Sequence, residues 1–419
     1  MFLDEYDETP YNVLNFLTSY INYGGRVTDA IDLRVIDVIL RDFYNKNILR
    51  DDYAFSTSGT YVSLEINPDS PQRGYLERIE ALPVNAEPDI FGMHTNANIA
   101  CALNETFDLF DTLVLLQPRT TGGGGQTRED VIYEDVLDLQ LRLPPNFDIE
   151  GIGMQYPTRY DESMNTVLLQ ESTRYERLLR ALQSSLEQLK KALKGLVVMS
   201  GELESMADAF YSQKVPEAWE AVAYPSLKPL KSWFQEFVDR VLFLQKWIEN
   251  GIPSAYWISG FFFPQAFLTG TLQNYARKHI LPIDSISFSF NIIRDRPTEL
   301  AERPQDGCLV YGLFMEGARW SFSKWSITES RPKELYTDLP VVHFMPVKDR
   351  KVTTKGVYRM PIYKVLSRAG TLSTTGHSTN FVLWIEIPSD REKFINNLGL
   401  SDQDTWIKAG VACFCSLRY

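Results

Sequence analysis

The stretch that decides the fold class is residues 175–196, YERLLRALQSSLEQLKKALKGL. Its apolar residues recur in alternating steps of four and three, which is the spacing of one face of an α-helix. The pattern predicts a long helix over about 163–209, in which Gly195 and Gly201 are positions where the helix bends or ends. Because the charges beside the stripe are not systematically paired, we interpret it as a face packed within the chain rather than as a dimerising coiled coil.

Two further helices follow toward the C-terminus. The first is stopped by Gly251 and Pro253, and its apolar face consists of Trp233, Phe237, Val241, Leu244 and Ile248. Pro264 is placed to start the second, which extends to about Lys278, because proline is favoured in the first helical turn. The aromatic segment between them, residues 256–264, is predicted to form a core plug between a helical and a β region.

From about Pro282 the hydrophobic period changes to two. In residues 286–292, ISFSFNI, apolar and polar side chains alternate as they do in a half-buried strand. Further short strands, separated by glycine and proline, are predicted over 308–315, 319–323, 341–347, 358–363, 381–387 and 409–417. This pattern is typical of a small β-barrel or sandwich. The predicted fold class is therefore α+β, with helices followed by a C-terminal antiparallel β-barrel.

The residues before the long helix form a third region. Helical spacing of apolar residues predicts helices over 32–44, 96–117 and 129–143. A glycine-rich loop, residues 120–127, separates the second helix from the third. The N-terminal region is therefore predicted to be α-helical.

Length and charge limit the kind of protein this is. A chain of 419 residues is too long for one compact core, so two or three domains are expected. The net charge of -12 argues against a nucleic-acid partner, because phosphate binding needs a surplus of lysine and arginine. The N-terminus does not resemble a signal peptide, and the most apolar stretch, residues 256–268, is too short to cross a bilayer. We expect a soluble, intracellular protein with no membrane partner.

No motif in the sequence carries catalysis. The glycine run 122–125 is followed by Gln126, where a nucleotide-binding P-loop would have lysine. Cys413 and Cys415 have strand spacing but lack further metal ligands nearby in the sequence. No metalloprotease or hydrolase motif includes any of the four histidines, His94, His279, His343 and His377. The sequence therefore predicts no catalytic, cofactor-binding or metal-binding residue, and the chain is not expected to be an enzyme.

Several segments, in order along the chain, resemble dynein heavy chains of the axonemal (ciliary and flagellar) type. The segments similar to the sixth AAA+ module of that family are 8–16 (ETPYNVLNF), 22–29 (NYGGRVTD) and 91–98 (FGMHTNAN). Those similar to its C-terminal domain are 193–200 (LKGLVVMS), 256–278, 312–320 (GLFMEGARW) and 370–381. The resemblance implies four parts: the end of the sixth AAA+ large subdomain (1–22), its small subdomain (23–150), and the helical (151–280) and β-barrel (281–419) parts of the C-terminal domain.

The resemblance also implies a function. The parent motor would be a microtubule-stimulated ATPase that drives ciliary and flagellar beating, with its ATP and magnesium sites outside this chain. Within it, this region would brace the AAA+ ring and tune motor output without a nucleotide site of its own. Its partners would be other AAA+ modules of the same heavy chain and dynein complex subunits. Microtubules would be contacted only through a distant stalk, and the location would be the cytoplasm, the cytoskeleton and the axoneme.

Two other classes of function stay open. One is an independent adaptor with a β-barrel that binds a protein or a sugar, for which Trp320, Trp325 or Trp384 would line an exposed groove. The other is an enzyme of unfamiliar type, which would bring His343 and His377 together with carboxylates in a deep pocket.

Overall fold

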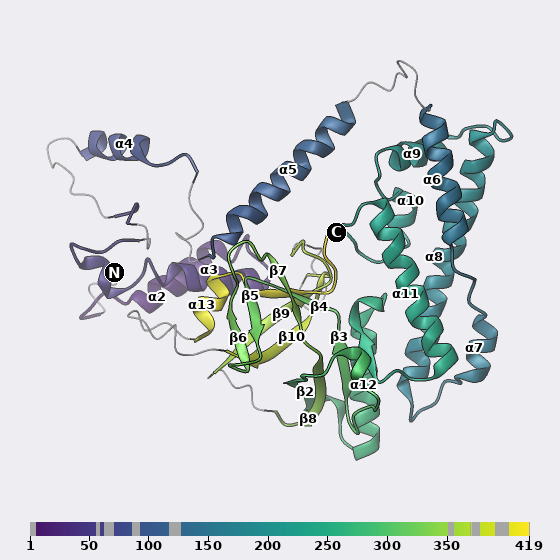
Figure 1. Cartoon of the computed structure of the whole chain (residues 1–419). Helices are drawn as coiled ribbons and strands as arrows, with labels where there is room; N and C mark the ends of the chain where they lie inside the picture. Colours follow the sequence, from purple (N-terminus) through teal and green to yellow (C-terminus); the bar gives the residue numbers. More distant parts are fainter. Residues whose placement is uncertain are drawn as a thin grey trace.

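The computed structural model places a helical bundle on one side, β-sheets in the centre and N-terminal helices on the far side (Figure 1). It describes residues 6–55, 59–62, 71–85, 93–116, 127–350, 356–368, 370, 378–389 and 402–418. The glycine run 122–125 and His377 lie outside these residues.

The bundle is built around α8 (Ser163–Leu193), which packs against α6 (Arg128–Arg142), α9 (Gly201–Tyr211) and α11 (Leu230–Asn250). Two short helices, α7 (Ile149–Gln155) and α10 (Glu217–Glu220), also contact α8. The leucine stripe forms the core of the bundle, with no exposed surface at Leu178, Leu179, Leu182, Leu186 and Leu189. Burying each of these side chains stabilises the fold by about 1.5–3 kcal/mol. The predicted packing of the stripe within the chain is confirmed.

The stretch predicted as a long helix over 163–209 is two helices, because α8 ends at Leu193, and the predicted end of the helix at Gly195 is confirmed. Gly195 has a φ of 70°, a left-handed conformation that stops a helix and that glycine adopts at little cost. Helix α9 then starts after Ser200, whose side chain accepts a hydrogen bond from Leu203 N. Leu196 lies in the connection between the two helices, where it is 72% exposed and does not extend the buried stripe.

Helix α12 (Pro264–His279) connects the bundle to the sheets, and proline at its start confirms the predicted boundary. The preceding segment contains β1 (Ala255–Trp257) and the 3-10 turn η4 (Ile258–Gly260). Phe261 stacks on Phe267 of α12 with 4.4 Å between ring centroids. The predicted core plug is confirmed, because the following side chains of this segment are buried: Tyr256, Ile258 and Phe261.

The remaining strands follow α12. They are β2 (Ile286–Ile292), β3 (Cys308–Tyr311), β4 (Leu313–Glu316), β5 (Ala318–Ser321), β6 (Ser326–Glu329), β7 (Tyr336–Leu339), β8 (Val342–Lys348), β9 (Val357–Tyr363), β10 (Phe381–Pro388) and β11 (Ala412–Phe414). One sheet has the order β1-β3-β8-β2 and a second the order β10-β9-β11-β4-β7. In the third sheet β5 pairs with β6.

These sheets do not close into the antiparallel barrel that the alternation predicted. Two of the pairings are parallel, β1 with β3 and β11 with β9. The strand predicted over 308–315 is in fact β3 and β4, which belong to different sheets. Gly312 separates them with a φ of 86°, and a Cβ at this position would lie 2.3 Å from the Trp257 indole. In a closed β-barrel every strand pairs with a neighbour on both sides. The sharp turn at Gly312 instead carries the chain from one sheet to the next.

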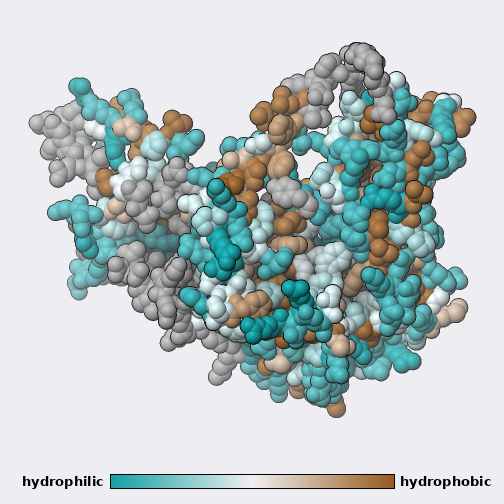
Figure 2. Space-filling view, in the orientation of Figure 1, coloured by the Kyte–Doolittle hydropathy of each residue, from teal (hydrophilic) through white to brown (hydrophobic). Residues whose placement is uncertain are grey.

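The N-terminal helices are α2 (Tyr11–Phe16), the π-helix η1 (Leu17–Tyr23), α3 (Ala30–Leu40), the 3-10 turn η2 (Lys46–Leu49), α4 (Pro71–Ala81) and α5 (Asn96–Leu116). Helix α3 packs against α13 (Asp402–Lys408), which precedes β11. Helix α5 extends away from the sheets, and apolar side chains gather along it (Figures 1 and 2). The predicted helix over 96–117 is confirmed, but Leu109, Phe110 and Leu113 on it are 57%, 58% and 48% exposed.

Asn96 attaches the base of α5 to the sheets. Its side-chain amide donates to the carbonyl oxygens of Arg331 and Glu334, both at 2.9 Å, and its carbonyl accepts from Lys333 N at 2.8 Å. We expect Asn96→Ala to lower the free energy of unfolding by about 1–3 kcal/mol, because three hydrogen bonds of a buried side chain would be lost. Urea titration measures this effect, and Asn104→Ala, at an exposed position of the same helix, is the matched control. If Asn96→Ala and Asn104→Ala unfolded at the same urea concentration, Asn96 could not be the residue that attaches α5 to the sheets.

Candidate functional site: a buried polar seam between helices and sheets

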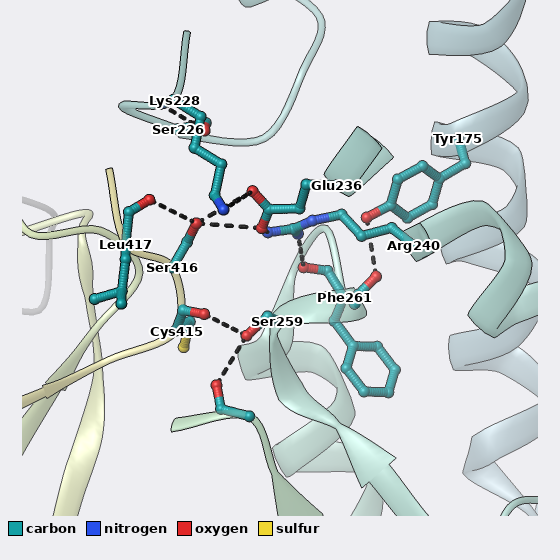
Figure 3. Close-up of polar contacts among 12 residues, drawn as sticks. Tyr175, Ser226, Lys228, Glu236, Arg240, Ser259, Phe261, Cys415, Ser416 and Leu417 are labelled. Atoms are coloured by element: carbon teal, nitrogen blue, oxygen red, sulfur yellow. Dashed lines mark hydrogen bonds and ion pairs between the residues drawn. The ribbon is translucent and has the colours of Figure 1, made fainter. Parts of the chain in front are cut away.

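A buried ion pair lies where the bundle meets the end of the sheet region (Figure 3). Glu236 and Arg240 are one turn apart on α11, and Arg240 Nη2 donates to Glu236 Oε1 at 2.6 Å. Their side chains are only 8% and 4% exposed. The charges are therefore removed from water, and each depends on its partners for compensation. We call this pair, with Ser259, Ser416 and the two tyrosines described below, the seam.

The segment that follows β11 is bonded directly to this ion pair. Ser416 Oγ lies 3.2 Å from both carboxylate oxygens of Glu236 and donates to them. Lys228, on the segment before α11, places its ammonium 3.6 Å from the same carboxylate. Ser259 Oγ donates to the carbonyl oxygen of Cys415 and, at 3.1 Å, to that of Gly312. Helix α11, the aromatic plug and the end of the sheet region therefore share one hydrogen-bond network.

Two tyrosines complete the seam on the bundle side. The Arg240 guanidinium carbon lies 3.7 Å from the ring centre of Tyr224, a cation–π contact. Tyr175 of α8 donates its hydroxyl to the Gly260 carbonyl oxygen at 2.9 Å. Burial raises the pKa of Tyr175, so its phenol stays protonated and remains a donor at neutral pH.

A second polar anchor attaches α8 to the aromatic plug. Glu171 on α8 is fully buried, and its carboxylate accepts hydrogen bonds from Phe262 N and, at 3.2 Å, from Phe263 N. Arg174 donates to it at 2.7 Å. Burial raises the pKa of Glu171, and these donors act in the opposite direction by favouring the charged carboxylate. The bundle is thus bound to the same segment through two separate helices.

The N-terminal helices reach the sheets through a third set of contacts. Trp384 of β10 packs against two guanidinium groups, those of Arg34 on α3 and Arg359 on β9, at 4.7 and 4.8 Å from the ring centre. Lys408 of α13 donates to the carboxylate of Asp42 at 2.6 Å. These charged and aromatic contacts place α3 on the second sheet.

Among the groups that could carry chemistry are two buried cysteines and a histidine whose surroundings the structure describes. Burial raises the pKa of Cys308 and Cys415 to about 12, so these thiols are protonated and unreactive at neutral pH. His343 Nε2 lies 2.8 Å from the Asp306 carbonyl oxygen. In the part of the protein that the structure describes, no three His, Cys, Asp or Glu side chains gather as metal ligands. None of the described helices is both long and apolar enough to cross a membrane.

The tryptophans considered for an adaptor groove lie in different places. Trp384 is on the second sheet, whereas Trp320 and Trp325 belong to the β5–β6 hairpin. Trp320 is 8% exposed and packs edge-on against Trp325, with 5.9 Å between ring centroids.

Sequence reasoning predicted no site residue and missed the seam. The available signal was the position of Glu236 and Arg240, which are spaced as an i, i+4 pair beside the apolar face of a helix. Charged residues at that spacing usually lie on a solvated surface, so the pattern alone does not indicate burial. Ser416 gave no signal, because its partner is 180 residues away in the sequence.

Comparison with known proteins gives the family. A family model described as the C-terminal domain of the dynein heavy chain matches residues 103–415, and one described as the dynein heavy chain AAA lid domain matches residues 1–97. Human dynein axonemal heavy chain 1 is 51% identical over 419 residues, human dynein axonemal heavy chain 3 is 43% identical over 417, and mouse dynein axonemal heavy chain 12 is 42% identical over 421. Each alignment includes 100% of this chain but only 10%, 10% and 13% of the relative.

The chain thus spans about a tenth of the length of the relatives it matches, and the alignments include all of its own residues. The helices and sheets joined by the seam lie within the range of the C-terminal-domain match, and α2 to α4 lie within that of the lid-domain match. The chain belongs to the dynein heavy chain family, as a C-terminal region of the axonemal type.

Proposed function

We propose that this chain is the bracing and regulatory C-terminal region of an axonemal dynein heavy chain, an ATP-driven microtubule motor. The observation that carries the proposal is the seam, in which Glu236 of the bundle, paired with Arg240, accepts a hydrogen bond from Ser416, just after β11. Glu236 and Arg240 are both on α11, so the hydrogen bond from Ser416 is what joins the end of the sheet region to the pair, and breaking it leaves a buried carboxylate with one donor fewer. Such a junction resists sliding between helices and sheets, as a brace that transmits force must.

Exposed apolar surface supports a role inside a larger assembly. Beyond the side chains of α5, the connection between α8 and α9 presents four consecutive apolar residues, exposed by 40–87%: Leu196, Val197, Val198 and Met199. Contiguous exposed apolar residues are typical of surfaces that another protein region covers. We propose that other AAA+ modules of the same heavy chain and subunits of the dynein complex cover these surfaces.

We propose that the other functions of the motor reside outside this chain. ATP and magnesium would be bound outside this chain, and microtubules would be held by a distant stalk, in keeping with the net charge of -12. The region would act in the cytoskeleton, at the axoneme of cilia or flagella, as the names of its relatives suggest.

The test is an axonemal heavy chain whose C-terminal region is this chain, with the substitution Ser416→Ala. The variant loses one hydrogen bond to a buried carboxylate, about 1–2 kcal/mol, so it should still fold. We expect slower microtubule gliding with ATP turnover per motor unchanged. A less rigid junction would transmit less of each conformational change as movement, whereas the sites of ATP hydrolysis would lie outside this chain. Ser287→Ala, an exposed serine on β2, is the matched control. Wild-type gliding by the Ser416 variant, or ATP hydrolysis by the isolated chain, would refute the proposal.

A further inference from the structure

A pocket of about 580 Å³ opens beside the β5–β6 hairpin, away from the seam. Its described lining combines positive charge with hydroxyl groups, among them Arg319, Ser321, Ser323, Thr328, Ser330 and Arg331. These residues lie within thirteen positions of one another in the sequence, so the hairpin builds most of the wall itself. One carboxylate, that of Glu329, is also in the lining, and it lies 3.8 Å from His94 Nε2.

Two arginines in this wall have no carboxylate within ion-pair distance among the described residues. Arg319 on β5 is partly buried, and its Nε is inaccessible to solvent and has no hydrogen-bond partner there. Arg331, just after β6, is exposed and contributes only its backbone carbonyl to the Asn96 anchor. Guanidinium groups present a planar fork of donors that matches phosphate oxygens. In a protein with a net charge of -12, two such arginines in one hollow are a local reversal of charge.

The hydroxyl groups add donors and acceptors around the arginines. Ser321 Oγ lies 3.0 Å from Ser323 Oγ, and Thr328 Oγ1 donates to the Arg319 carbonyl oxygen at 3.4 Å. Ser330 is only 5% exposed, and its hydroxyl has no partner among the described residues. A buried hydroxyl without a partner is costly, and rotation about its χ1 allows it to meet a ligand atom.

We propose that this pocket binds the phosphate group of a small hydroxylated phosphate ester, with Arg319 and Arg331 on the phosphate and the serine and threonine hydroxyls on the rest of the molecule. The volume exceeds what one phosphate fills, so it leaves space for an organic part. Trp406 lines the pocket but is 1% exposed, so it offers no ring face on which a nucleobase could stack. The ligand is therefore a polar phosphate ester rather than a nucleotide.

The experiment is isothermal titration calorimetry of the whole chain with glycerol 3-phosphate, inorganic phosphate and glycerol at constant ionic strength. We expect saturable binding of glycerol 3-phosphate, weakened by about tenfold or more in Arg331→Gln, because losing a charge-assisted hydrogen bond costs at least one such factor in affinity. Arg319→Gln should weaken binding similarly. The control is Arg294→Gln, which removes an exposed arginine that lies beside Phe322 and outside the described lining.

The two phosphate sources give different results. Tighter binding of the ester than of inorganic phosphate identifies an ester site, whereas equal affinity for both identifies a site for free phosphate alone and overturns the ester proposal. Absence of saturable binding, or equal affinity in the Arg331 and Arg294 variants, would overturn it as well. Because Arg331 is exposed, its substitution should leave folding intact, so a negative result is informative. The outcome is independent of the bracing function, which makes no use of this pocket.

Discussion

Replacing Arg240 by methionine should lower the free energy of unfolding by about 3–5 kcal/mol, the typical cost of leaving one member of a buried ion pair without its partner. Of its partners among the described residues, Glu236 would keep Ser416 at 3.2 Å and Lys228 at 3.6 Å, while its carboxylate stays almost inaccessible to water. The cation–π contact with Tyr224 would also disappear. Chemical denaturation of the whole chain, followed by tryptophan fluorescence, measures the change.

The double variant Glu236→Leu/Arg240→Met separates the charge from the packing. Removing both charges leaves no uncompensated ion, so we expect it to recover much of the stability that the single substitution loses. A single variant as stable as the wild type would show that the seam is not an energetic junction. A double variant no more stable than the single one would attribute the loss to packing rather than to charge.

Leu186→Asp should have a comparable or larger effect. Leu186 is fully buried in the stripe of α8, so the substitution removes an apolar contact and introduces a carboxylate without a partner. The expected loss is more than about 4 kcal/mol, which a domain of ordinary stability does not readily survive. The readouts are the soluble yield and the thermal midpoint followed by circular dichroism.

A milder variant keeps this prediction testable if the aspartate variant does not fold. Leu186→Ala should lower the free energy of unfolding by about 2–5 kcal/mol through the cavity it leaves. Gln188→Asp introduces the same charge at an exposed position of the same helix and should change stability little. If Leu186→Asp unfolded no more readily than Gln188→Asp, the stripe could not be the core of the bundle.

The aromatic plug shows how far a sequence pattern can predict packing. Residues 256–264 are predicted to form a plug because a cluster of large rings next to a helix start has few places to go except a core. Tyr256 and Phe261 are indeed buried, but Phe263 is 42% exposed. The Arg174 guanidinium carbon lies 5.6 Å from the centre of this exposed ring. The composition of the segment therefore predicts that the cluster as a whole is buried, but it does not predict which of its rings faces solvent.

Local patterns were sufficient wherever the physical cause is local. The helical period of the leucine stripe, the start of α12 at Pro264 and the alternation in β2 all follow from side chains within a few residues of one another. The alternation of Cys413 and Cys415 is also local, and both thiols face the main core while Phe414 packs in the cluster on the opposite side. For the same reason the α+β class was accessible from the sequence.

Tertiary structure alone decided which surfaces meet. Gly195 could bend or end a helix, and it ends one because the backbone must turn back toward α9. Gly312 divides an apparent strand between two sheets, so the predicted barrel does not close. Glu236, Arg240 and Ser416 form a junction only because α11 and the end of the sheet region are packed together across 180 residues of sequence. The periodicity of the sequence predicts which side of a helix or strand is apolar. Which other element packs against that side depends on contacts between residues far apart in the sequence, so a short stretch of sequence does not predict it.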